Sequence, residues 1–204
     1  MAISKARSAN EEAFLDAAER LLVTTGYAGI SVRRLADEAG ANHGLVHYYF
    51  GSMEELFLRV LERFTLRLIE RQRAMYSTDA PFIDKWRAAM RFMDEDLAAG
   101  YPKIWFELQA MAWNHPDMRE RVTHVNAEWR AVLTEAFTRA ADDYGLDHRR
   151  FPVEAMVSLV MTFNVGMMLE RMEGITTGHQ ELRDGIEAWL AELERAKTKK
   201  GGKR

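Results

Sequence analysis

The chain has 204 residues, of which 48% are hydrophobic, and it contains no cysteine. That length is enough to bury a sizeable core in one or two domains, and the lack of cysteine excludes disulfides, thiolate metal sites and cysteine nucleophiles. The formal net charge of −3 excludes a general basic field, so any affinity for nucleic acid must come from local placement of charge.

Simple criteria find no targeting or membrane segment. There is no uninterrupted run of 18 apolar residues, so we expect no transmembrane helix. No apolar stretch follows Lys5 and Arg7 near the start, which argues against a signal peptide. We therefore expect a cytoplasmic protein with no membrane partner.

Capping residues predict three helices in the first 50 residues. Apolar residues recur there at spacings of three and four, which is typical of helices. Ser8 and Glu11 form a capping box, Ser31 is a good N-cap, and Gly40 suits a tight turn before a further cap at Asn42. The expected helices cover 8–25, 31–39 and 42 to about 50.

The rest of the chain continues the helical pattern. Ser52 and Glu55 form a second capping box. Each of the four prolines lies at the start of a predicted helix, where its missing N–H has no partner in any case. With no convincing strand, the sequence predicts an all-α fold of nine helices, the later ones covering 52–75, 81–99, 102–113, 116–144, 152–173 and 179–196.

Two short helices joined by a glycine turn are typical of a helix-turn-helix. On a helical wheel, Val46 and Phe50 share the face that is expected to pack inward. The other face presents imidazole, phenol and bare backbone from His43, Gly44, His47 and Tyr48. In such a motif the second helix enters the major groove of DNA and the first touches the phosphates.

The stretch from Ile30 to Leu56 resembles the DNA-binding signature of the TetR family of transcriptional regulators. The resemblance rests on Ala39-Gly40, Gly44, Tyr49-Phe50 and Ser52-Met53-Glu54-Glu55-Leu56 in register, and it covers roughly the first 60 residues. It implies a helix-turn-helix domain over 8–56 with its motif at about 31–50. It also implies an effector-binding and dimerisation domain over 57–196, leaving a disordered basic tail over 197–204.

The resemblance also assigns roles in DNA binding. It implies that Ser31 and Arg33 lie near phosphates and that the groove is met by Asn42, His43, Gly44, Leu45, His47 and Tyr48. Met53, also expected at the DNA, stands where the family usually has a phosphate-contacting lysine, which removes one cation per subunit. Residues 1–56 contain five Lys and Arg against eight Asp and Glu. From the residues alone, the two histidines also suit a metal or a solvated surface.

Methionine and aromatic residues are frequent beyond residue 57, and methionine fills irregular space. Such a stripe is more often plain core, but the resemblance implies a pocket for a small apolar effector. The expected lining is Phe64, Leu68, Met90, Met93, Trp105, Leu108, Gln109, Met111, Trp113, Met161, Asn164 and Met167. Candidate polar anchors are Glu107, Gln109, Asn114, Thr162 and Asn164.

The last two predicted helices carry apolar stripes, and the resemblance implies that they form a homodimer through residues 152–196; packing within one subunit is the alternative. The expected function is a ligand-responsive regulator, most often a repressor, that binds double-stranded operator DNA and needs no cofactor, metal or catalytic residue. A helical-bundle enzyme, or a small-molecule-binding protein without a DNA function, is the alternative. No His follows Glu or Asp by three residues, as a di-iron bundle needs, and no phosphate loop is present.

Overall fold

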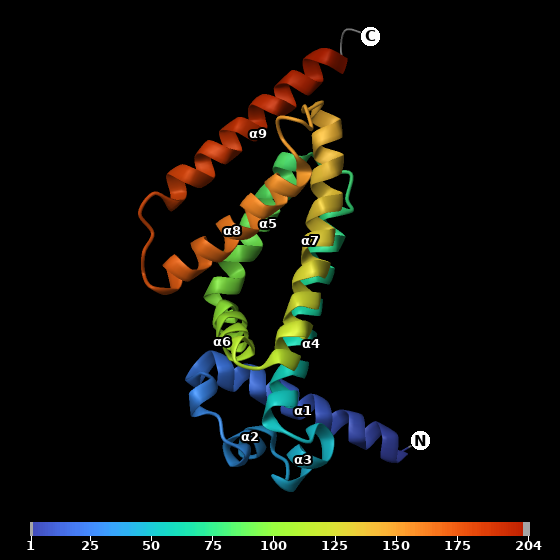
Figure 1. The fold of residues 1–204 in the computed structure, drawn as a ribbon, viewed down its shortest axis with the longest axis vertical. Coiled ribbons are helices and arrows are strands. Elements are labelled where there is room, and N and C mark those ends of the chain that lie inside the picture. Colours follow the sequence, from blue (N-terminus) through green and yellow to red (C-terminus); the bar gives the residue numbers. More distant parts are fainter. Residues whose placement is uncertain (1, 202–204) are drawn as a thin grey trace. The chain divides into compact units, whose positions relative to one another are not determined.

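The computed structural model describes residues 2–201, and the side chains of residues 9–199. Within this range the chain is all-α, as the sequence predicts, with nine helices and one 3₁₀ turn, η1 (Figure 1). The elements are α1 (Ala2–Thr25), η1 (Tyr27–Gly29), α2 (Val32–Ala39), α3 (Gly44–Phe50), α4 (Met53–Tyr76), α5 (Phe82–Ala98), α6 (Tyr101–Trp113), α7 (Pro116–Tyr144), α8 (Val153–Met172) and α9 (His179–Gly201).

Three helix ends differ from the sequence prediction by two residues or more. α1 begins at Ala2 instead of at the capping box of Ser8, so that box does not start the helix. α3 begins at Gly44, after the predicted cap, because the Asn42 side chain accepts the Gly44 N–H. α9 continues to Gly201, so residues 197–201 of the predicted disordered tail are helical, and residues 202–204 lie outside the described residues.

The chain divides into two compact units. Unit 1 comprises the described residues up to Arg67 together with Ala99–Val125, and unit 2 comprises Leu68–Ala98 together with the chain from Asn126 onward. Each unit is therefore built from two separate stretches, whereas the sequence suggests one boundary after residue 56. The difference arises because α4 and α7 are long enough to begin in unit 1 and end in unit 2.

The core of unit 1 is built where the first three helices meet. Phe14 of α1, Leu35 of α2 and Val46 of α3 are all fully buried. The rings of Phe14 and Phe50 meet edge to face, with their centroids 6.1 Å apart, a favourable aromatic geometry. This packing fixes α3 by one side and leaves its other side for a partner.

A row of arginines on α4 ties it to α1 within unit 1. Arg59, Arg63 and Arg67 are spaced four residues apart, so they lie along one face of the helix. The Arg59 guanidinium donates to Glu11 at 2.5 Å, and both Arg63 and Arg67 donate to Glu19 at 2.6 Å. We call this set the α1–α4 ion-pair row; Arg63 also pairs with Glu12 and Asp16.

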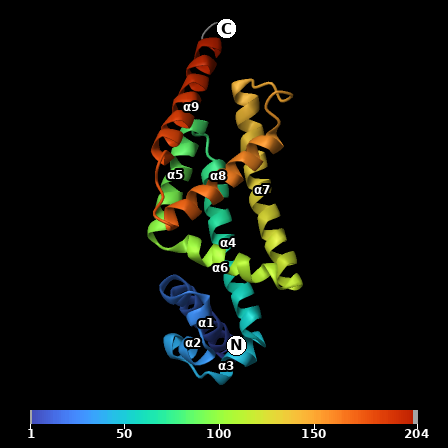
Figure 2. The same ribbon diagram turned by 60° about the vertical axis from the view of Figure 1, so that its left-hand side comes forward.

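Unit 2 contains two apolar clusters. One joins α4, α7 and α8 around Ile69 and Val157. The other joins α5, α8 and α9 around Trp86, Met167 and Leu190, and both views show α9 running alongside α5 (Figures 1 and 2). An ion-pair cluster adds to it, with Asp94 accepting hydrogen bonds from Arg171 and Arg183. Burial alone would raise the pKa of Asp94, but the two arginines lower it.

Helix α8 is unusually apolar and poorly covered. Among the described residues it is the one helix whose length and composition would allow it to cross a membrane, with a mean hydropathy of 1.3 over 18 residues and 17% of that window buried. A search for uninterrupted apolar runs misses it because Ser158, Thr162 and Asn164 interrupt the pattern. Much of its apolar surface is therefore left uncovered within unit 2.

Candidate nucleic-acid interface and effector residues

Local hydrogen bonds build the turn between α2 and α3. The Ser31 hydroxyl oxygen accepts the Arg34 N–H at 3.2 Å, which caps α2 and leaves the hydroxyl proton free to donate. Gly40 has φ 63° and ψ 32°, a left-handed conformation that favours glycine. The Asn42 side chain then accepts the Gly44 N–H at 2.9 Å. Every one of these contacts spans three residues or fewer.

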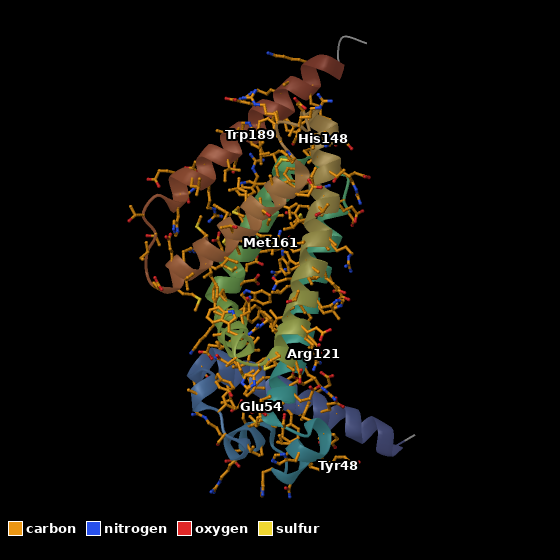
Figure 3. The ribbon with its side chains drawn as sticks, in the orientation of Figure 1. Tyr48, Glu54, Arg121, His148, Met161 and Trp189 are labelled. Atoms are coloured by element: carbon orange, nitrogen blue, oxygen red, sulfur yellow. The ribbon has the colours of Figure 1, made fainter. Side chains whose placement is uncertain are left out.

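Helix α3 has the two faces that its sequence predicts. Val46 is fully buried and Phe50 is 4% exposed. His43, Gly44 and His47 are exposed, Tyr48 is 64% exposed at the outer surface of α3 (Figure 3), and Leu45 is half-buried. The side chains expected at the groove therefore share the solvent side of the helix.

The His47 imidazole is tied to the end of its own helix. Its Nδ1 atom lies 3.0 Å from the carbonyl oxygen of Gly51, while the Gly51 N–H donates to the His47 carbonyl at 2.9 Å. Gly51 has φ 75° and ψ −46°, which turns its carbonyl back towards the ring. Over the described residues, no group of three or more potential ligands is arranged to hold a metal.

Ion pairs absorb most of the acidic charge of the first 56 residues. Of the eight carboxylates there, six pair with arginines of α1, α4 and α7: Glu11, Glu12, Asp16, Glu19, Glu38 and Glu55. Most of these carboxylates therefore serve in ion pairs that hold the helices together, and they contribute less to the electrostatic potential at α3. This removes the main objection that net charge raises against DNA binding.

The residues that are expected to contact phosphates lie at the start of α4 and the start of α2. Ser52 accepts the Glu55 N–H at 3.1 Å, so the predicted cap is present, and Met53 next to it is half-buried. The backbone N–H of Glu54 and the Ser52 hydroxyl lower the pKa of Glu54, which keeps a negative charge at this helix start. Arg33 on α2 is exposed.

Glu107 of α6 has a role that the sequence does not indicate. The sequence suggests Glu107 as a polar anchor for a ligand. In the structure its carboxylate accepts a hydrogen bond from the backbone N–H of Tyr27. A Cβ atom placed on Gly26 would lie 2.7 Å from Glu107 Oε1, so the glycine makes room for the carboxylate. Glu107 therefore fixes the loop that leads from α1 to the cap of α2.

The expected effector residues divide between the two units. In unit 1, Leu108 is fully buried, Met111 is 8% exposed, and Phe64 packs edge to face on Tyr101 with centroids 5.3 Å apart; Trp105 and Gln109 are half-buried, and Asn114 is exposed. Trp113 is 69% exposed, so its contact with an effector stays a prediction. Its position at the last residue of α6 leaves little around it to pack against.

In unit 2 the structure brings Met90, Met93 and Met167 together in one cluster. Leu68 and Met161 are half-buried and Thr162 is exposed. The Asn164 Oδ1 atom is buried and has no hydrogen-bond donor among the described residues. An orphaned buried acceptor costs stability, which makes it a point where a ligand would be stabilised.

Two polar features of unit 2 were not expected from the sequence. In the part of the chain that the structure describes, Gln72 Oε1 is also buried without a donor. The sequence signal for it is a glutamine on the face of α4 that carries Ile69 and Tyr76. Arg71 pairs with Asp96 at 2.5 Å and lies 4.3 Å from the centre of the Phe92 ring. Burial raises the pKa of Asp96 despite that pair.

Unit 1 also contains an open cavity of about 460 Å³ between α1 and the start of α6. Its rim carries the carboxylates of Glu19 and Glu38, and these are already paired with arginines. None of the expected effector residues is among those that line it: Asp16, Glu19, Arg20, Leu21, Val23, Thr24, Glu38, Ala99, Tyr101 and Ile104.

Comparison with known proteins places these features in context. Residues 14–60 match the family model described as bacterial regulatory proteins, tetR family. The chain is 33% identical over 184 residues to the HTH-type transcriptional repressor AcnR of Corynebacterium efficiens, covering 87% of this chain and 90% of that protein. A TetR transcription regulator from Haloarcula marismortui shares the fold with a TM-score of 0.72 at 19% identity, covering 91% and 97% of the two chains. FadR of Bacillus subtilis, solved in complex with stearoyl-CoA, has a TM-score of 0.69 at 16% identity, covering 88% and 96%.

Proposed function

The chain belongs to the TetR family of bacterial regulatory proteins and is a DNA-binding transcriptional regulator; from this we propose that it binds a pseudo-palindromic operator as a homodimer and is released by a small apolar molecule. The observation that carries the proposal is α3, which is anchored by Val46 and Phe50 and exposes His43, His47 and Tyr48. A short helix with a buried face and an exposed polar, aromatic face fits the major groove.

The contacts with DNA follow from this placement. Tyr48 and the two histidines face base edges, with Gly44 and Leu45 close to them and Asn42 at the helix start. The Ser31 hydroxyl proton and the Arg33 guanidinium reach phosphates on either side. Met53 lies against the backbone without contributing a charge, so affinity depends on few cations.

The proposed dimer uses α8 and α9. Both carry large apolar side chains that unit 2 leaves exposed: Leu159 (70%), Val165 (39%), Leu169 (44%), Met172 (44%), Leu182 (49%) and Trp189 (42%). Exposed apolar groups of this extent mark an interaction surface. A second copy on this face produces a two-fold dimer, which presents two copies of α3 to two half-sites about one helical turn apart.

The proposed effector is a small apolar molecule with a polar group. Support comes from the methionine-rich cluster of unit 2, from the orphaned oxygen of Asn164, and from the fold relative solved with stearoyl-CoA. Such a ligand releases DNA only if it binds more tightly to an arrangement of the protein that does not fit the operator. Helices α4 and α7 are the physical links, because each continues from unit 1 into unit 2.

DNA binding is tested with the purified chain. Fragmented DNA from the source genome is selected on the immobilised protein, and the affinity of enriched fragments is measured by fluorescence anisotropy. Tyr48→Ala is expected to weaken specific binding by about 1–3 kcal/mol if the ring reads a base. Trp113→Ala is the matched control, since it also removes an exposed aromatic ring from unit 1. Failure to enrich any fragment, or equal losses in both variants, would contradict the proposal.

A further inference from the structure

We propose that His47 reads the major groove as a hydrogen-bond acceptor and therefore selects a base that carries an exocyclic amine there, adenine or cytosine. The inference rests on the proposed function, since it requires α3 to lie in the major groove. It concerns the protonation pattern of one ring, which determines what kind of base edge the ring is able to recognise.

The contact with Gly51 determines which ring nitrogen carries the proton. The Nδ1 atom lies 3.0 Å from the Gly51 carbonyl oxygen. That oxygen only accepts hydrogen bonds, so a contact at this distance requires a proton on Nδ1. A neutral imidazole has one N–H, and the other nitrogen is then an acceptor. Nε2 of neutral His47 is therefore left with its lone pair.

The backbone holds this arrangement in place. The Gly51 N–H donates to the His47 carbonyl at 2.9 Å, so the two residues are joined by two hydrogen bonds in opposite directions. The direction of the Gly51 carbonyl depends on φ 75°, a backbone conformation that a Cβ atom disfavours. The tautomer is consequently set by the helix end and does not depend on DNA.

The free nitrogen belongs to an exposed side chain on the face of α3 opposite its buried anchors. His47 is exposed, and α3 is anchored through Val46 and Phe50 on its other face. In the described part of the chain, the contact with Gly51 is the hydrogen bond that the His47 ring makes. Nε2, across the ring from Nδ1, is thus available to a partner in the groove.

The chemistry of the major groove then selects the base. Adenine offers an N6 amine and cytosine an N4 amine, whereas guanine presents only the acceptors N7 and O6, and thymine presents O4 and a methyl group. The lone pair on Nε2 accepts a hydrogen bond from either amine, whereas it is repelled by the acceptor atoms of guanine and thymine. One neutral hydrogen bond of this kind corresponds to a preference of about threefold to tenfold.

His43 provides an internal comparison. It lies four residues earlier on the same exposed face, but no carbonyl contact of the kind made by His47 is found among the described residues around it. Its ring is free to present either nitrogen as donor or acceptor. A fixed preference for amines is accordingly expected at the base contacted by His47 and not at the base contacted by His43.

The test uses selection from random-sequence DNA with the full-length protein and variants. The base pair read by His47 is identified as the one whose preference disappears in His47→Ala, with His43→Ala as the control. His47→Glu keeps an acceptor and is expected to retain adenine or cytosine there, whereas His47→Arg supplies donors and is expected to change the preference to guanine. At that position, 2-aminopurine in place of adenine, or 2-pyrimidinone in place of cytosine, removes the major-groove amine. It should weaken the wild type about threefold to tenfold and His47→Ala not at all.

The outcomes separate the two proposals. If the wild type enriches no sequence, the proposed function fails and this inference fails with it. If the wild type enriches a sequence but the His47 position prefers guanine or thymine on the contacted strand, the inference alone fails. Full affinity after removal of the amine, or unchanged preferences in His47→Ala, also overturns it while leaving DNA binding intact.

Discussion

Replacing Gly26 by alanine is expected to destabilise unit 1 by two separable effects. Gly26 has φ 75° and ψ 167°, a region that is essentially restricted to glycine and costs other residues about 1–3 kcal/mol. The new Cβ would also lie 2.7 Å from Glu107 Oε1. A glutamate end is flexible, so the carboxylate moves away cheaply, but it then loses the Tyr27 N–H. A hydrogen bond to a charged group contributes about 1.5–3 kcal/mol; because this one is exposed, we expect about 1–2 kcal/mol.

A double-mutant cycle isolates the second effect. Gly26→Ala is expected to cost about 2–5 kcal/mol in the wild type but only the backbone strain, about 1–3 kcal/mol, in a Glu107→Ala background. Gly40→Ala is the control, because Gly40 also has a positive φ and a Cβ there would meet nothing within 4 Å. Its cost should not depend on Glu107. Free energies of unfolding come from urea denaturation, and exchange of the Tyr27 amide proton reports the bond directly. Additivity of Gly26→Ala and Glu107→Ala within about 0.5 kcal/mol would refute the reasoning.

Three further changes test other parts of the molecule. Met53→Lys adds a cation at a helix start expected to lie against phosphate, so it should tighten binding to any DNA and steepen the salt slope by about one unit per subunit; an unchanged slope means that this position does not approach the backbone. Asn164→Leu removes the orphaned buried oxygen, so it should raise the free energy of unfolding, measured by denaturation, by about 1 kcal/mol. It should also lower the affinity for the effector, measured by calorimetry; a clear loss of stability would show that the oxygen has a partner. Leu159→Glu places a charge where the side chain is 70% exposed and should give a folded monomer in analytical ultracentrifugation, whereas a persistent dimer argues against the α8–α9 interface.

The helix-turn-helix could be predicted because its determinants are local. Ser31 and Ser52 cap backbone N–H groups three residues ahead, and the burial of Val46 and Phe50 follows from a spacing of four. The glycine at 40 has the left-handed backbone that a tight turn requires. Contacts between residues three or four positions apart can be read from the sequence, because the atoms that interact are already close in the chain.

Contacts between distant segments could not be predicted in the same way. Glu107 and Tyr27 are 80 residues apart, and the acids of α1 meet the arginines of α4 across 44 to 51 residues. A glutamate on an apolar helix fits a ligand anchor as well as it fits a loop clamp, so the sequence does not distinguish these roles. Trp113 illustrates the same limit, because an apolar sequence pattern does not show that this aromatic residue lies exposed at the end of α6.

The α1–α4 ion-pair row has a mechanical consequence. A gap of about 0.5–1 Å between apolar side chains forfeits about a quarter to a half of their dispersion attraction, whereas the energy of an ion pair falls only in proportion to the inverse of the separation. Arg63 already has three acidic neighbours within reach, so a small slide of α1 along α4 exchanges one partner for another. We therefore expect the α1–α4 ion-pair row to keep the two helices joined during a small displacement of one along the other.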